Sequence, residues 1–474
     1  MDYRDAAHLF RRLAFGGRPE QIQALASLGR EAAVDQLLNI EAVNNKPMEK
    51  ALKRMIRNTP DFDIARRWWF ARMIMTEAPF EEKMTLFWHN HFATSDLKAF
   101  GLTVPYQVLT LRALGMGRFD DLLLAVAQDP AMIIWLDNLF STKDRPNENW
   151  AREVMELFTM GISGRDGPNY TENDIKEIAR AFTGWSIRIV RPTTAFNPKK
   201  ADPFSFSFQD NQHDHGTKTI FGLPAADLDG TDVIKILAAR PATARFLVKK
   251  LFAFFVFPLN DSDPSDQDII EEFAQVYLSS DHSIKATVAA IFKSDVFFSD
   301  RARFGLVKNP VEIIVGAIRM LGADYQDSGS GVASSVSLHQ VAGRMGMYIY
   351  RPEDVSGWKL GLSWIGTSTL LERYNFATAL MSNRTSDSTQ PAPFVSNDQL
   401  KLHVKSTAAD TVASFLNLLG PIETGQDTVD RLTNYLETDE RGNAITFTPD
   451  DATINRKIRG LVRHIMCLPE FQLN

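Results

Sequence analysis

Hydrophobic residues recur at helical spacing through most of the chain. In the stretch that begins at Pro79, the residues Met84, Phe87, Trp88 and His91 are separated by three or four positions and so share one helix face. The same spacing returns in most of the segments that follow. The pattern predicts a mainly α fold, a globular array of many helices.

The region 186–222 departs from this pattern. Phe204 to Phe208 reads FSFSF, an alternation with period two that predicts a β-strand. The residues 217–221 are the expected partner strand. We therefore predict a β-hairpin inserted into the helical array at 186–222.

Changes in composition predict how the chain is divided. Residues 1–381 are expected to form a helical core that carries the insertion, and 382–398, rich in Ser, Thr, Asn and Pro, reads as a linker. Residues 399–474 are predicted to be a helical C-terminal segment packed on this core. A Gly- and Ser-rich stretch at 325–337 is expected to be a mobile loop.

Composition and charge narrow the class of protein. The chain has 474 residues, of which 44% are hydrophobic and 23% charged, as in ordinary globular proteins. The net charge is −6, and Lys and Arg are scattered among acids, which argues against nucleic acid as the main partner. The single cysteine, Cys467, excludes an intrachain disulfide and a cysteine-based metal site.

The sequence contains no pattern of a secretory or membrane-spanning segment. The N-terminal residues show no pattern of a secretory signal, and no run approaches 18 apolar residues. As given, the sequence predicts a soluble, cytoplasmic protein without a transmembrane segment.

Two histidines lie in the helix that begins at Pro79. His89 and His91 are two residues apart, which places them about 200° from each other around a helix, so both cannot bind one ion. His91 shares the apolar face, and His89 lies on another. Two interpretations of His91 stay open: a core histidine hydrogen-bonded to a carboxylate or carbonyl, or a metal ligand completed by residues from elsewhere.

A second polar cluster covers 147–156. Asn147 is placed to cap a helix, along which Glu148, Arg152 and Glu156 form a charged ladder, with Asn149 and Glu153 on another flank. The ladder is read either as a solvated face with weak ion pairs or as part of a catalytic site. In the next helix, Thr171 and Asp174 have the spacing of a capping box, which accounts for most of the acids at its start.

A polar loop near the predicted hairpin contains the remaining histidine pair. His213, Asp214 and His215 follow one another in the segment QDNQHDHG. Loop histidines are more often solvated than bound to a metal, although loops also carry function disproportionately. We keep both interpretations.

Several of these motifs together resemble one bacterial family. The segments FWHNHFATS, RPNENWAREVMELFTMGI, YTENDIKEIARAFTGW, HDHGTKTIFG and VSGWKLGLSWI, in this order, are similar to the family called domain of unknown function 1800 (DUF1800). HLFRRLAFGGRP near the start, PATARFLVKKLFAFFV and LPEFQ at the end extend the resemblance over nearly the whole chain.

The resemblance implies where family members are found and what is encoded beside them, but it implies no particular reaction. Family members are often exported, and they are often encoded beside a protein similar to sulfatases and alkaline phosphatases, which becomes a possible partner here. This sequence lacks the export signal. The polar positions of the family motifs fall on the following residues: His89, Asn90, His91, Asn147, Glu148, Asn149, Arg152, Glu153, Glu156, Thr171, Glu172, Asp174, His213, Asp214 and Lys218.

Two functions follow as hypotheses. The first is a metal-assisted enzyme that holds one divalent ion between helices. Its predicted metal ligands come from His89, His91, His213 and His215, and its predicted catalytic residues are Glu148, Asn149, Arg152 and Glu153. This hypothesis requires His91, Glu148 or Glu153, and His213 to converge.

The second hypothesis is a non-catalytic scaffold that binds a polymer or a partner protein. In it, the same His, Glu, Asn and Arg residues form a structural polar network, and the segment around Trp358 and Trp364 supplies contact surface. Metal analysis of the purified protein would separate the two.

Overall fold

A computed structural model describes the chain except for residues 56–61, 100–101, 165–166, 191–194, 326–336 and 383–393. The fold is mainly α, as predicted, with two small antiparallel sheets of two strands each in the described part. The predicted mobile loop at 325–337 and the predicted linker at 382–398 fall largely on residues outside the described part.

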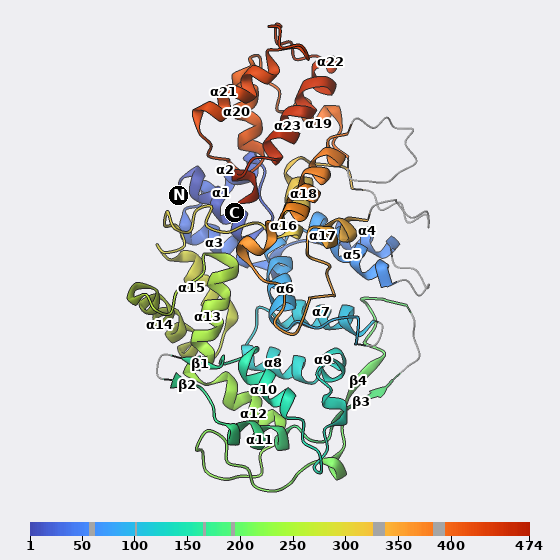
Figure 1. The fold of residues 1–474 in the computed structure, drawn as a ribbon, viewed down its shortest axis with the longest axis vertical. Helices are drawn as coiled ribbons and strands as arrows, with labels where there is room; N and C mark the ends of the chain where they lie inside the picture. The colour runs from blue at the N-terminus through green and yellow to red at the C-terminus, as the bar shows by residue number, and fades with distance from the viewer. Residues whose placement is uncertain (56–61, 100–101, 165–166, 191–194, 326–336, 383–393) are drawn as a thin grey trace.

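In Figure 1 the chain begins near the middle of the elongated molecule, runs to one end at α11 and α12, and returns past the middle to α20, α21 and α22 at the other end. The first half contains α1 (Tyr3–Leu13), α2 (Pro19–Ala26), α3 (Arg30–Leu38), η1 (Ile40–Ala42), α4 (Lys46–Met55), α5 (Phe62–Met75), α6 (Pro79–His91), α7 (Thr103–Leu114), α8 (Phe119–Ala127), α9 (Pro130–Trp135), η2 (Asn138–Phe140), α10 (Glu148–Glu156), α11 (Glu172–Ala181), η3 (Asp210–Gln212) and α12 (Gly230–Ala238). The second half contains α13 (Pro241–Phe255), α14 (Pro264–Ser279), α15 (Ile284–Lys293), α16 (Pro310–Met320), α17 (Leu338–Arg344), η4 (Gly361–Trp364), α18 (Thr367–Leu380), α19 (Asn397–Lys401), α20 (Ala408–Leu418), α21 (Gln426–Leu436), α22 (Asp451–Thr453), η5 (Ile454–Ile458), α23 (Arg459–Met466) and η6 (Glu470–Gln472). Among the described helices, none combines the length and apolar composition that a bilayer span requires.

The strands correct one prediction. β4 (Phe204–Phe208) pairs with β3 (Trp185–Ile189), whereas residues 217–221 fold back on a bridge between Lys218 and Ala226. Trp185 directs the pairing because its buried ring packs against Phe206 across the ladder, with ring centroids 5.0 Å apart. A further short pair, β1 (Ser163–Gly164) with β2 (Gly167–Pro168), lies beyond α10.

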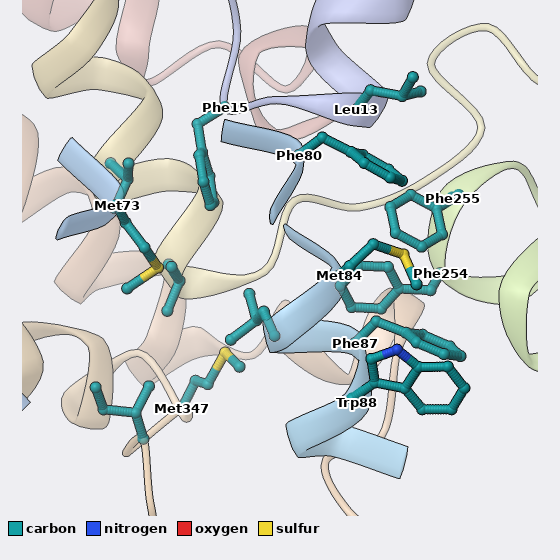
Figure 2. Close-up of a cluster of buried hydrophobic side chains, with 14 of the residues drawn as sticks. Leu13, Phe15, Met73, Phe80, Met84, Phe87, Trp88, Phe254, Phe255 and Met347 are labelled. Atoms are coloured by element: carbon teal, nitrogen blue, oxygen red, sulfur yellow. The ribbon is translucent and has the colours of Figure 1, made fainter. Parts of the chain in front are cut away.

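Helix α6 runs through the main core. Pro79 occupies the first turn, where a missing N–H is harmless, and Phe92 ends the helix with its N–H bonded to the Trp88 carbonyl at 2.8 Å. In Figure 2, Phe80, Met84 and Phe87 of α6 face Phe254 and Phe255 of α13. The Phe87 and Phe254 rings lie 5.5 Å apart in an edge-to-face arrangement, which is favourable for aromatic pairs.

The N-terminal end of α6 carries buried charges. Glu82 is fully buried and binds Arg72, Arg112 and the Trp69 indole N–H, the last at 2.8 Å. Its neighbour Lys83 pairs with Glu312 of α16. Burial alone would raise the pKa of Glu82, but Arg112 and Arg72 hold it below its ordinary value. These ion pairs fix the rotation of α6 relative to α5, α7 and α16.

We expect Glu82→Gln to lower the free energy of unfolding by about 3–5 kcal/mol, because Arg72 and Arg112 would remain buried without their shared carboxylate. Glu81→Gln is the matched control: Glu81 is partly exposed, and among the described residues it pairs with Arg72 alone, so its loss should cost less than about 1 kcal/mol. Urea unfolding of the two variants measures both. Equal losses would contradict the role given to Glu82.

Candidate metal centre

Helix α11 is the base on which the histidine loop is built. Its capping box is the predicted one: Thr171 and Asp174 bond each other's backbone N–H. The other Asp174 oxygen accepts the Phe221 N–H at 2.6 Å. One turn further on, Glu177 accepts the Thr219 N–H at 3.1 Å. Acids that serve the helix start therefore also hold the loop that follows His215.

The C-terminal end of α11 holds the loop at a second point. Arg180 binds both carboxylate oxygens of Asp214, at 2.7 and 3.0 Å. This hydrogen-bonded guanidinium lowers the pKa of Asp214 to about 2. Asp214 separates His213 from His215, so the bidentate pair orients both histidines.

His213 has one ring nitrogen committed to the protein. Its Nδ1 lies 2.8 Å from the Thr183 carbonyl oxygen, which can only accept, so Nδ1 carries the proton and Nε2 keeps the lone pair. The ring is 4% exposed and packs against Phe208. Gly184 makes this approach possible, because a Cβ there would lie 2.6 Å from the Gln209 carbonyl oxygen.

His215 is the exposed counterpart. Its Nε2 lies 3.3 Å from an Asp210 oxygen and its Nδ1 lies 3.6 Å from Asp227 Oδ2. The rings of His213 and His215 are 4.9 Å apart. One ring nitrogen thus faces Asp210, and the other faces the centre of the cluster.

Asp227 enters the cluster through backbone pairing. The Lys218 and Ala226 backbones exchange hydrogen bonds of 2.7 and 3.1 Å, which brings residue 227 back beside the histidines. The buried Lys218 ammonium then binds Asp227 Oδ1 at 3.1 Å. That hydrogen bond lowers the pKa of the Asp227 carboxyl. Sequence reasoning missed Asp227, because only the fold-back at 218–226 places it here.

The three side chains form a group suited to a metal ion. Ligand atoms of His213, His215 and Asp227 all lie within 4.8 Å of one another. Two imidazoles and a carboxylate suit Zn²⁺ and related divalent ions, whose ligands lie about 2.0–2.2 Å away. His215 and Asp227 are half exposed, which leaves room for the small inward movement that coordination would need.

The histidines of α6 lie elsewhere. His89 accepts the Tyr350 N–H at 3.0 Å through Nε2, and His91 donates from Nε2 to the Phe158 carbonyl at 3.0 Å. Both are buried, and they face different segments, as predicted from their spacing. Neither belongs to a possible metal-binding group among the residues that the structure describes. For His91, the geometry is that of a core histidine.

The charged ladder of α10 does not reach His213. Glu148 and Asn149 are exposed, and Arg152 lies 3.8 Å from Glu156 and 3.6 Å from Glu172 at the start of α11. Glu172 and Arg180 are eight residues apart, which is about 12 Å along the helix. The ladder and the histidine loop therefore occupy opposite ends of α11.

Glu153 faces a different neighbour. Burial raises the pKa of its carboxyl, and Glu156 and Asp354 add to this effect. Asp354 belongs to the segment that Asn90 holds, where the Asn90 side chain accepts the Trp358 N–H at 2.6 Å. A Cβ at Gly357 would lie 2.3 Å from the Asn90 carbonyl oxygen, so only glycine fits there.

The described chain is thus a mainly α protein with a candidate His/Asp centre on a loop. It belongs to a family described as "Protein of unknown function (DUF1800)", which matches residues 8–473. No curated protein and no solved structure matches the chain.

We expect the buried histidines to make the protein sensitive to acid. Burial lowers the pKa of His89 and of His91 to about 3, against about 6.5 in an unfolded chain. A folded-state pKa below the unfolded one means that stability is complete above pH 6.5 and falls as the pH drops toward 3. Each histidine should contribute about 1.4 kcal/mol per pH unit to that loss.

The slope of unfolding free energy against pH, measured with urea between pH 6.5 and 5, tests this. His91→Gln keeps a donor for the Phe158 carbonyl. It should reduce the slope by about the contribution that one protonating histidine makes. His464→Gln, on the partly exposed surface of α23, is the comparison: burial lowers the pKa of His464 less than that of His91, so this change should remove a smaller share of the slope. An unchanged slope in His91→Gln would refute the assignment.

Proposed function

We propose that the protein binds one divalent metal ion at His213, His215 and Asp227 and uses it in a hydrolytic reaction. The observation that carries this proposal is that a group outside the cluster lies at one ring nitrogen of each histidine. The Thr183 carbonyl accepts from Nδ1 of His213, and an Asp210 carboxylate oxygen lies 3.3 Å from Nε2 of His215. Metal-binding histidines are oriented in this way, since the outer bond fixes the tautomer.

Asp227 has the corresponding arrangement. Lys218 holds Oδ1, and Oδ2 remains turned toward His215. With three protein ligands, a further coordination position stays open to solvent, as in catalytic zinc sites. A divalent ion held there would act as a Lewis acid and lower the pKa of a bound water. With Asp227 held by Lys218, the open coordination position would lie on the exposed side of the loop.

The catalytic residues predicted on α10 remain a separate proposal. Glu148, Asn149, Arg152 and Glu153 lie beyond hydrogen-bonding reach of the loop along α11, so a role for them would involve a long substrate or a second site. Glu153 is the strongest of the four, because its raised pKa suits a general acid. A partner similar to sulfatases and alkaline phosphatases also remains a proposal from the family resemblance.

A scaffold function is the second candidate, and α6 favours it. His89, Asn90 and His91 each bond the backbone of another segment, at Tyr350, Trp358 and Phe158. The family motif around these residues is accounted for by structure alone. In this case the protein would bind no metal, and His213 and His215 would only close their loop.

Metal binding decides between the two functions. We expect calorimetric titration with Zn²⁺ or Mn²⁺ to give one site per chain, and His213→Ala or Asp227→Asn to weaken it at least tenfold, the lower end of what losing even an outer partner costs. His464→Ala is the control and should bind normally. Wild-type protein that takes up no divalent ion would refute the metal site.

Turnover tests the hydrolytic part separately. We expect metal-loaded protein to hydrolyse p-nitrophenyl acetate or p-nitrophenyl phosphate, and EDTA or His213→Ala to abolish the activity. Glu153→Gln should leave metal binding intact in either case. Metal binding without turnover of any ester would favour a structural ion over catalysis.

A further inference from the structure

A second site lies far from the histidine loop, where the first helix meets the last residues of the chain. A cavity of about 10 Å³, enough for roughly one water-sized sphere, is enclosed between α1, α16 and the segments near Gly420 and Phe471. Its polar lining consists of Arg11, Lys308, Glu312 and Asn474.

Arg11 is buried without an ion-pair partner among the residues that the structure describes. Its side chain is 4% exposed, and Nη1 donates to the Gly420 carbonyl at 3.1 Å. Nε and Nη2 have no hydrogen-bond partner in the described part of the chain. The guanidinium rests on the Phe304 ring, 4.2 Å from its centroid. A buried guanidinium with two unused donors is costly unless something accepts from them.

Lys308 is also buried and also has donor hydrogens to spare. Its buried ammonium donates to the Phe471 carbonyl at 2.7 Å and lies over the Phe471 ring. Burial, with a contribution from Arg11, lowers its pKa to about 7. Three donor hydrogens meet one acceptor here, so donors remain for a ligand.

The carboxylates near these charges are engaged elsewhere. Glu423, which acts on Arg11 from beyond ion-pair distance, is paired with Arg4. Glu312 is the acid that lines the cavity, and both of its oxygens are in use: one binds Lys83, and the other accepts the Asn309 N–H at 2.8 Å. Arg12 and Arg373 are also buried beside this region and bind carbonyl or amide oxygens only. Within the described chain, none of these four cations forms an ion pair with an acid.

We propose that a small anion occupies this cavity and bridges Arg11 and Lys308. Its chemistry is that of a dissolved halide, because the space admits about one water-sized sphere. The anion locks α1 to the segment around η6 and is independent of the metal site.

Bromide tests the proposal. Crystals of the wild-type protein soaked in NaBr should show an anomalous peak between Arg11 and Lys308. At constant ionic strength, chloride should raise the melting temperature relative to gluconate by roughly 2 °C for each tenfold rise above its dissociation constant. Arg11→Met should abolish both effects. Arg431→Gln, which removes an exposed ion pair on α21, should abolish neither.

The absence of a bromide peak between Arg11 and Lys308, with no effect of halide on the melting temperature, would overturn the proposal.

Discussion

The structure depends on the pairing of polar side chains along a buried helix. Glu82 and Lys83 near the start of α6, and His89, Asn90 and His91 near its end, each bond a different segment. A helix buried on all sides can rotate or slide at little hydrophobic cost. Directional bonds from these five residues remove that freedom, because any shift would leave buried groups unpaired.

The polar residues that fix α6 in the core are therefore different from those of the candidate metal site. The α6 histidines are buried and hydrogen-bonded to other segments, whereas His213 and His215 lie on a loop held by α11. The loop is anchored through Asp214, Thr219 and Phe221, and its histidines are left facing one another. Helix α11, which carries polar residues at both ends, is therefore the scaffold for the candidate metal site.

The buried cations form a third feature, away from the histidine loop and nearer the middle of the molecule, where α1 and α16 lie in Figure 1. Arg11, Lys308 and Arg373 gather where the N-terminal helix, α16 and the last residues meet. Burying several like charges together is unfavourable, so such an arrangement persists only when other groups compensate for it. Backbone carbonyls supply part of that compensation, and an anion would supply the rest.

Much of the local structure was predictable from the sequence. Helical periodicity, the cap at Asn147 and the capping box at Thr171 all depend on residues a few positions apart, and the sequence displays such spacing directly. It also showed that His89 and His91 face different ways. The tertiary structure alone decided that β4 pairs with β3, and that Asp227 joins His213 and His215. These outcomes depend on how the chain folds back between distant positions, where many pairings have similar local preferences and only packing of the whole core selects among them.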